Sequence, residues 1–152
     1  MHLELTRRGD YAVRAMLALA MAGDVGPTSV REIATAMDIP VAFLPQVMGA
    51  LGRAGLVASR TGRAGGYTLT RPPAAISLLE IIEAVEGDSR RTSCVLRGGP
   101  CGRDGHCLAH AVFTAAQQAL LDRLADATLQ DVAGAPGDDG TVGPDRSRRS
   151  RR

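Results

Sequence analysis

The sequence predicts a mainly α-helical fold with one β-hairpin and a long helix toward its C-terminal end. Three observations lead to this prediction: apolar residues recur at helical spacing, capping residues stand where these runs begin, and two short β-prone runs flank a glycine-rich turn. The chain has 152 residues, of which 45% are apolar and 3% aromatic. This is enough for one domain with a core of its own.

Two helices are expected in the first 37 residues. Thr6 is a suitable N-cap for the first, whose apolar residues keep helical spacing until Gly23. Ser29 and Glu32 have the spacing of a capping box and predict a short helix that ends near Met37.

A third helix follows after a three-residue connection at residues 38–40. Its inward stripe comprises Phe43, Leu44, Val47, Met48 and Leu51, and Gly55 ends it. Two short helices joined by so tight a turn are typical of a helix-turn-helix. Pro45 lacks an amide hydrogen, so we expect it to disturb the first turns of this helix.

A β-hairpin is predicted next, with strands at residues 56–60 and 67–70 and a turn of sequence Thr-Gly-Arg-Ala-Gly-Gly. A hairpin directly after a helix-turn-helix is the arrangement called a wing. Glycines allow close approach to a groove wall, and Arg60 and Arg63 have the charge that suits a narrow minor groove. The alternative is an ordinary exposed hairpin whose arginines keep it soluble.

Two further helices are expected beyond residue 72. Ser77 and Glu80 form another capping box, flanked by Ile76 and Ile81 as a hydrophobic staple, for a helix that stops at Gly87. Residues 108–124 then form a long helix whose apolar stripe is too broad for a lone surface helix. Part of that stripe is expected to meet a second subunit. The alternative, compatible with the first, is that the stripe packs on the chain's own first helix.

Between these helices lies a cysteine segment, residues 87–107, that is rich in glycine. Its spacing is C-x6-C-x5-C through Cys94, Cys101 and Cys107, with His110 three residues later. Thiolate and imidazole ligands suit an iron-sulfur cluster or zinc, and the missing C-x2-4-C knuckle favours the cluster. A metal-free disulfide switch is an alternative. A catalytic cysteine with His106 or His110 as base lacks any oxyanion-hole signature, so no enzyme is expected.

Charge is distributed unevenly along the chain. Residues 1–71 hold eight arginines against five acidic residues, whereas residues 72–133 hold five against eight. From residue 134 onward the composition is that of a disordered basic tail. The expected division is therefore 1–72 for DNA binding, 73–133 for the cysteine segment and dimerisation helix, and 134–152 for the tail.

A cytoplasmic location is expected, with no membrane contact. The longest apolar runs fall short of the ~20 residues of a membrane span, and no signal-peptide pattern opens the chain. Three cysteines are an odd number, which argues against a disulfide framework.

In these motifs the sequence resembles the winged-helix iron-sulfur transcription regulators, the family that includes IscR and NsrR. The resemblance covers about residues 3–132 and rests on residues 6–16, 55–57, 65–67, 107–111 and 128–131 together with the triple cysteine loop. It implies a homodimer that binds a palindromic promoter site on double-stranded DNA. Its cluster would sense cluster supply, redox state or nitric oxide, and no small-molecule substrate is implied. Repression is expected as the default, because a small chain has little surface for recruiting polymerase.

The resemblance also implies a ligand set for the cluster. Cys94, Cys101 and Cys107 match the family's three cysteines, although six residues instead of the usual five separate the first two. His110 looks like the fourth ligand of the 2Fe-2S cluster in IscR. Asp10 looks like the aspartate that completes a 4Fe-4S cluster from the partner subunit in some NsrR proteins. The 2Fe-2S cluster is favoured, with 4Fe-4S as the alternative.

The predicted DNA contacts fall into two groups. The helix-turn-helix would reach the major groove or its phosphates, with Gln suited to adenine and Phe to a thymine methyl; the wing would reach the minor groove or phosphates. The predicted residues are Ser29, Thr35, Phe43 and Gln46 for the first group and Arg60, Thr61 and Arg63 for the second. A different class of protein remains open, namely a zinc-bound or cluster-free DNA-binding regulator that uses its thiols as a redox switch.

Overall fold

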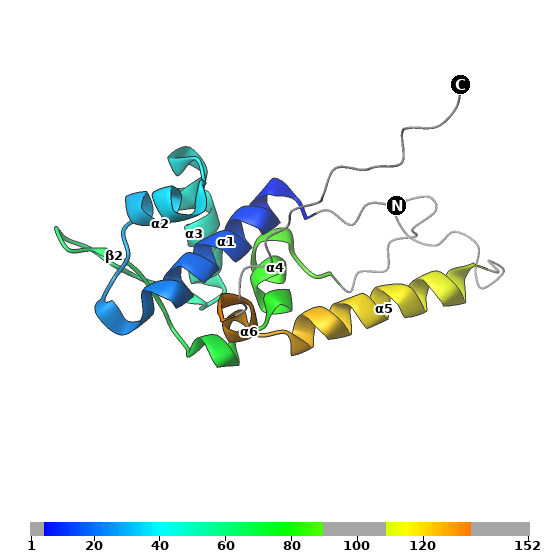
Figure 1. Ribbon diagram of the computed structural model, residues 1–152. Helices are drawn as coiled ribbons and strands as arrows, with labels where there is room; N and C mark the ends of the chain where they lie inside the picture. The colour runs from blue at the N-terminus through cyan, green and yellow to red at the C-terminus, as the bar shows by residue number, and fades with distance from the viewer. Residues whose placement is uncertain (1–4, 90–108, 135–152) are drawn as a thin grey trace, which may run out of the picture.

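The computed structural model describes residues 5–89 and 109–134 (Figure 1). It contains the helices and the single described hairpin that the sequence predicts. In chain order the elements are α1 (Arg7–Ala22), η1 (Gly23–Val25), α2 (Val30–Met37), η2 (Val41–Phe43), α3 (Leu44–Arg53), β1 (Val57–Arg60), β2 (Gly66–Leu69), η3 (Pro73–Ala75), α4 (Leu78–Glu86), α5 (His110–Asp126) and α6 (Leu129–Ala133). No helix within these two segments is long and apolar enough to cross a bilayer.

Side-chain caps set most helix starts. The Thr6 hydroxyl accepts a hydrogen bond from the Gly9 amide (3.2 Å), and α1 ends at Gly23, whose φ is +62°. The predicted capping boxes open α2 and α4. A third, from Thr128 and Asp131, opens the short helix α6, which was not among the helices predicted from the sequence.

Pro45 does not disturb α3, contrary to expectation. The residues before it, Val41–Phe43, form a 3-10 turn, and the α-helix proper begins only at Leu44. Pro45 is therefore the second helical residue, where an amide hydrogen would have no intrahelical partner. The helix starts later than the sequence pattern predicts, and this explains why proline is tolerated.

One core joins the helix-turn-helix to α4 and α6. α1 lies at its centre and packs against α2, α3, α4, α6 and β2. Ile76 and Ile81, the predicted staple, are both fully buried in this core. The other large side chains that are almost completely inaccessible are Met16, Ile33, Leu44, Val47, Met48, Leu51, Leu56 and Leu129.

The hairpin is antiparallel, with Val57 opposite Leu69 and Arg60 opposite Gly66. A third piece of chain joins its edge, because the backbone of Thr28 exchanges hydrogen bonds of 3.0 and 2.8 Å with that of Tyr67. This contact requires glycine at position 66, since a Cβ there would lie 2.4 Å from the Thr28 carbonyl oxygen. The hairpin is thus attached to the segment that precedes α2.

α5 projects from the body on the side opposite the hairpin (Figure 1). It packs against α4, whereas α6 is the element that packs on α1 and η3. The expectation that the long helix would pack on the first helix therefore applies instead to α6. Main-chain hydrogen bonds between Leu78 and Ala127 (2.9 Å) and between Leu129 and Ile76 (2.8 Å) hold the end of α5 and the start of α4 together.

Candidate nucleic-acid interface

The outer face of α3 is the first part of the candidate interface. Leu44, Val47 and Leu51 face the core and are at most 1% exposed. Gln46, on the opposite side, is exposed, and Phe43 is 45% exposed immediately before the helix. Phe43 and Gln46, the two residues predicted to contact bases, therefore share an accessible surface.

The predicted contacts before and within α2 differ from each other in accessibility. Thr35 is exposed on α2. Ser29 is half-buried, and its hydroxyl accepts a hydrogen bond from the Glu32 amide (3.3 Å). The Glu32 carboxylate accepts a hydrogen bond from the Ser29 amide (2.7 Å). Hydrogen bonds from the side chain and the backbone of Ser29 lower the pKa of Glu32. Ser29 thus has a structural role as a cap, and its hydroxyl can still accept or donate a second hydrogen bond.

The wing presents the basic residues of the second group. Arg60, Thr61 and Arg63 are all exposed at or next to the hairpin tip. The tip is narrow because Gly62 has a φ of +114° and the Gly65 amide donates to its carbonyl (3.0 Å). The two arginines therefore lie on a compact projection with no bulky side chain between them.

A contact network that the sequence analysis missed connects α1 to the helix-turn-helix turn. Arg14 donates from Nη1 to the carbonyl oxygens of Met37 (2.7 Å) and Asp38 (3.3 Å), which end α2. Its Nε and Nη2 donate to the two carboxylate oxygens of Asp10, so Asp10 and Arg14 form a two-pronged ion pair. The hydrogen bond to Asp10 raises the pKa of Arg14.

The same network reaches the surface of α3. The guanidinium of Arg14 lies 5.2 Å from the ring centre of Tyr11, and that ring lies 5.7 Å from the ring of Phe43. Asp10 and Arg14 are four residues apart in a helix, a spacing that favours ion pairs and was available in the sequence. Their contact with residues 37 and 38 had no sequence signal.

The cysteine segment lies mainly outside the described residues, and so do its three predicted ligands, Cys94, Cys101 and Cys107. His110 is described and exposed as the first residue of α5. Asp10 is half-buried and engaged by Arg14. Within residues 5–89 and 109–134, no three His, Cys, Asp or Glu side chains are grouped as a metal site.

The first residues of the cysteine segment, which the structure describes up to Ser89, are held by two helices. The Ser89 amide donates to Glu83 of α4 (3.2 Å), and Gln117 of α5 donates to the Ser89 carbonyl (3.5 Å). Glu86, at the end of α4, accepts from the amide and hydroxyl of Thr6 (3.1 and 2.7 Å). The start of the segment is thus linked to α4, to α5 and to the first turn of α1.

α5 carries an apolar face that no described part of this chain covers. Val112, Ala115, Ala116 and Ala119 follow the spacing i, i+3, i+4, i+7 and are all exposed, Val112 by 70%. The opposite side faces α4 and holds Leu121, the one buried residue among the seventeen of α5. Alanines at these positions would let another helix approach closely.

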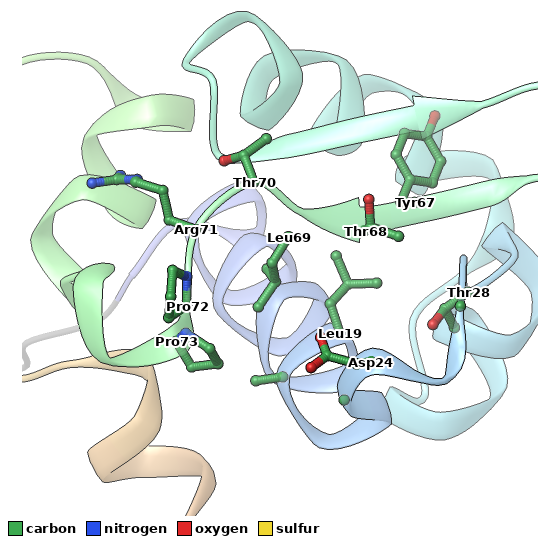
Figure 2. Close-up of a pocket in the computed structure, with 13 residues that line it drawn as sticks. Leu19, Asp24, Thr28, Tyr67, Thr68, Leu69, Thr70, Arg71, Pro72 and Pro73 are labelled. Atoms are coloured by element: carbon green, nitrogen blue, oxygen red, sulfur yellow. The ribbon is translucent and has the colours of Figure 1, made fainter.

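A hollow of about 450 Å³ lies between the end of α1 and β2 (Figure 2). Its lining includes the apolar Leu19 and Leu69 and the acidic Asp24. Arg71 also lines it, but its guanidinium is paired with Glu80 of α4 at 2.8 Å. The described residues around this hollow include none of the predicted site residues.

Comparison with known proteins agrees with this geometry. The Rrf2 family, described as iron-dependent transcriptional regulators, matches residues 5–135. A putative HTH-type transcriptional regulator of Neisseria meningitidis, NMB1378, is 36% identical over 130 residues, which are 86% of this chain and 87% of the relative. The HTH-type transcriptional regulator IscR of Klebsiella pneumoniae is 35% identical over 130 residues, covering 86% of this chain and 79% of IscR. These relatives are transcriptional regulators, not enzymes.

Solved structures of two regulators have the same fold. CymR, the global cysteine regulator of B. subtilis, superposes with a TM-score of 0.72 at 30% identity, covering 87% of this chain and 97% of CymR. IscR of T. potens superposes with a TM-score of 0.70 at 30% identity, covering 87% of each chain. The winged-helix architecture and the resemblance found in the sequence are confirmed. The chain belongs to the Rrf2 family of iron-dependent transcriptional regulators.

Proposed function

We propose that the protein is a homodimeric repressor that binds a palindromic promoter site and that an iron-sulfur cluster on its cysteine segment controls this binding. One observation carries the DNA-binding part: an exposed recognition face on α3 and an arginine-bearing hairpin tip project from one packed unit. A helix face for the major groove and a basic wing for the minor groove or phosphates are what DNA recognition needs.

Within this proposal each group of residues has its own role. Gln46 would hydrogen-bond an adenine edge and Phe43 would contact a thymine methyl, while Thr35 and Ser29 would lie close to phosphates. Three wing residues, Arg60, Thr61 and Arg63, would enter the minor groove or bind the backbone. Tyr11 supports Phe43 from behind, since their rings are in contact.

The homodimer is supported by the exposed apolar face of α5. Pairing of this helix with its copy about a two-fold axis would cover Val112, Ala115, Ala116 and Ala119. The same axis would place two copies of α3 on two half-sites of a palindrome.

The cluster is proposed from the donor set and its position. Three cysteines and a histidine are ligands that iron-sulfur clusters accept, and His110 is accessible where the cysteine segment enters α5. Cys94, Cys101 and Cys107 would hold the cluster with His110 as fourth ligand, which favours the 2Fe-2S form. Asp10 would be the fourth ligand of a 4Fe-4S form, but only after its carboxylate leaves Arg14. When bound, such a cluster supplies a centre that reacts with oxidants and nitric oxide.

The chain's own contacts supply a route from the cysteine segment to the DNA surface. Ser89 is held by Glu83 and Gln117, and Glu86 joins α4 to the first turn of α1. About two turns further along α1, Arg14 holds the end of α2. A rearrangement of the segment would therefore reach the helix-turn-helix through α4 and α1.

We assign DNA binding to residues 1–72, cluster binding and dimerisation to residues 73–133, and an accessory basic tail to residues 134–152, in a cytoplasmic protein. The tail lies outside the described residues. Its arginines would add phosphate attraction that does not depend on base sequence.

A second candidate is a zinc-bound or cluster-free regulator that responds through its cysteine thiols. The solved oxidised form of CymR from Staphylococcus aureus, with a TM-score of 0.71 at 27% identity, favours this alternative. In that case two of the three cysteines would form a disulfide on oxidation, with two electrons passing to the oxidant.

The deciding experiment is anaerobic purification, followed by an absorption spectrum and by iron, sulfide and zinc analysis on one sample. About two irons and two sulfides per subunit in a coloured protein would support the 2Fe-2S form, and about four would support the 4Fe-4S form. Colourless protein with zinc or no metal after reconstitution would reject cluster control. Selection of bound sequences from random DNA, with the same sample, tests DNA binding independently.

A further inference from the structure

The outer face of α3 has few groups that can recognise a base. Its exposed or half-buried positions between the buried ones are Pro45, Gln46, Gly49, Gly52 and Arg53. Proline and glycine have no side-chain donors, so Gln46 and Arg53 supply all the side-chain hydrogen bonding of this face. The predicted contacts include Gln46 and omit Arg53.

Arg53 stands in the last turn of α3, yet its charged end lies one turn earlier. A Cβ placed on Gly49 would be 3.5 Å from Nη1 of Arg53, so the guanidinium extends back over Gly49. Side chains of a helix point toward its N-terminus, and the glycine leaves this path open. The charge is therefore next to Gly49 on the outer face, not at the helix's terminal carbonyls, where a purely helix-stabilising arginine would be expected.

The guanidinium of Arg53 also has no partner within residues 5–89 and 109–134. Arg14 and Arg71 pair with Asp10 and Glu80 respectively, whereas no hydrogen bond or ion pair of Arg53 is found in that part of the chain. All five of its donors are thus available to an external acceptor.

We propose that Arg53 is a specificity-determining residue that reads a guanine in the major groove through O6 and N7. The proposal rests on the proposed DNA-binding function and deepens it. Gly49 and Gln46 are three residues apart, a rise of roughly 4.5 Å, which exceeds one base-pair step of about 3.4 Å by only a little. The guanine read by Arg53 therefore lies one or two base pairs from the adenine read by Gln46.

The test is sequence selection from random DNA with the full chain and with Arg53→Ala, followed by affinity measurements on the selected site. Wild-type protein is expected to require one guanine in each half-site, with its replacement weakening binding roughly 5- to 150-fold. Arg53→Ala is expected to bind the selected site and the site with the replaced guanine equally. Arg53→Lys keeps the charge but not the two-pronged geometry, so it should recover nonspecific affinity and little of the guanine preference. Arg31→Ala, which removes an exposed arginine of α2, is the matched control and should keep the preference.

Two results would overturn the proposal while leaving DNA binding intact. One is an Arg53→Ala variant with unchanged base preference and a shallower salt dependence, which would make Arg53 a phosphate contact. The other is that the Arg53→Ala substitution leaves the affinity for every DNA site unchanged. A wild-type chain that selects no sequence at all would reject the proposed function together with this inference.

Discussion

The helix-turn-helix and α5 both have apolar residues at helical spacing, but these residues lie in different surroundings. In α3, Leu44, Val47 and Met48 are at most 1% exposed because α1, α2 and α4 cover them. In α5, Leu121 is buried while Val112 is 70% exposed. Burying an apolar side chain is worth about 1.5–3 kcal/mol, so the first region is stabilised within its own chain and the second leaves stabilisation available to a partner.

The two regions also differ in how their helices begin. α1 and α2 each start at a side-chain cap, from Thr6 and Ser29, and α3 starts after a 3-10 turn with Pro45 as its second residue. α5 starts at Ala109, which supplies none, directly after the cysteine segment. Local sequence thus determines the starts of the DNA-binding helices, whereas we expect the start of α5 to depend on whether the cysteine segment holds a cofactor. Changes in α5 should accordingly affect assembly and cofactor, and changes in the helix-turn-helix should affect DNA binding and local stability.

The largest effect is expected from Ala116→Arg on the exposed face of α5. A charged side chain there would prevent helix pairing, and the loss of the second half-site contact should weaken palindrome binding by roughly a hundredfold or more. The mass measured by analytical ultracentrifugation should fall to that of a monomer, with an unchanged circular dichroism spectrum. Gln118→Arg, on the polar side of the same helix, is the control and should remain dimeric. A dimeric Ala116→Arg variant would place the interface elsewhere.

His110→Ala should have the next largest effect, on the stability of the cofactor. Mutation of a residue that only hydrogen-bonds a metal ligand commonly lowers metal affinity roughly 10–100-fold. Removing a direct ligand should therefore shorten the cluster's lifetime in air about tenfold or more. Asp10→Ala should leave the spectrum unchanged, because the Asp10 carboxylate is held by Arg14. Absorption spectra and iron content of both variants decide the matter. The opposite pattern would contradict the 2Fe-2S assignment and favour a 4Fe-4S cluster.

Arg63→Ala at the wing tip should weaken operator binding by roughly three- to tenfold. Removing one phosphate contact also lowers the slope of log affinity against log salt by about 0.9 per subunit. Fluorescence anisotropy over a range of salt concentrations measures both quantities. Arg63→Lys retains the charge and should preserve the slope. Equal affinities of wild type and Arg63→Ala at every salt concentration would exclude the wing from the interface.

Arg14→Ala should lower the free energy of unfolding by about 1 kcal/mol. The charged hydrogen bonds to Met37 and Asp38 are lost, but the Asp10–Arg14 pair is partly exposed and adds little by itself. Urea unfolding measures the change, and faster hydrogen exchange of the Ile39 and Phe43 amides would localise it to the turn. Arg7→Ala, an exposed neighbour, is the control. Unchanged exchange at both amides would mean that the turn does not depend on Arg14.

Acid should have the smallest effect, through the capping boxes. Hydrogen bonds from Ser29 lower the pKa of Glu32 below its ordinary value of 4.5, and those from Thr128 lower that of Asp131 below 3.8. Burial acts to raise the pKa of Glu80, but bonds from Ser77 and Arg71 outweigh it and the net shift is downward. Groups with lowered pKa values stabilise the fold above their ordinary pKa and lose that contribution as pH falls through the folded value.

Thermal unfolding between pH 6 and pH 3 tests this expectation. The melting temperature should begin to decline below about pH 4.5. The stabilisation lost at each capping box should be smaller than the stabilisation lost in Arg14→Ala. Glu32→Gln keeps a neutral acceptor in the box and should show a shallower decline. A melting temperature independent of pH over this range would contradict a stabilising role for these carboxylates.

Sequence patterns were sufficient wherever the interacting residues are close along the chain. Thr6, Ser29 and Ser77 each cap a helix through a residue three positions away, and the hairpin strands are joined by a short glycine-rich turn. These interactions recur at set spacings, so they can be recognised without a structure. The cysteine spacing is also a local pattern, but the three cysteines lie outside the described residues and the ligand set stays a prediction.

Contacts between distant residues were decided by the tertiary structure. Arg14 meets residues 37 and 38, Glu86 meets Thr6, and Thr28 meets Tyr67 across 23, 80 and 39 positions in the sequence. Main-chain carbonyls and amides are present at every position, so no residue pattern marks which of them will be partners. The extension of Arg53 back over Gly49 likewise became visible only once the exposed side of α3 was known.

The sequence by itself determined the capped starts of α1, α2 and α4, the hairpin and the family, because capping, turn formation and motif spacing depend on residues that are close together in the chain. The tertiary structure decided that the apolar face of α3 is buried within the chain and that an apolar face of α5 is left exposed. The physical reason is that periodicity shows that a helix has an apolar face but not what covers it. α3 and α5 both have apolar residues at helical spacing, and the structure shows that Val47 is buried and Val112 exposed.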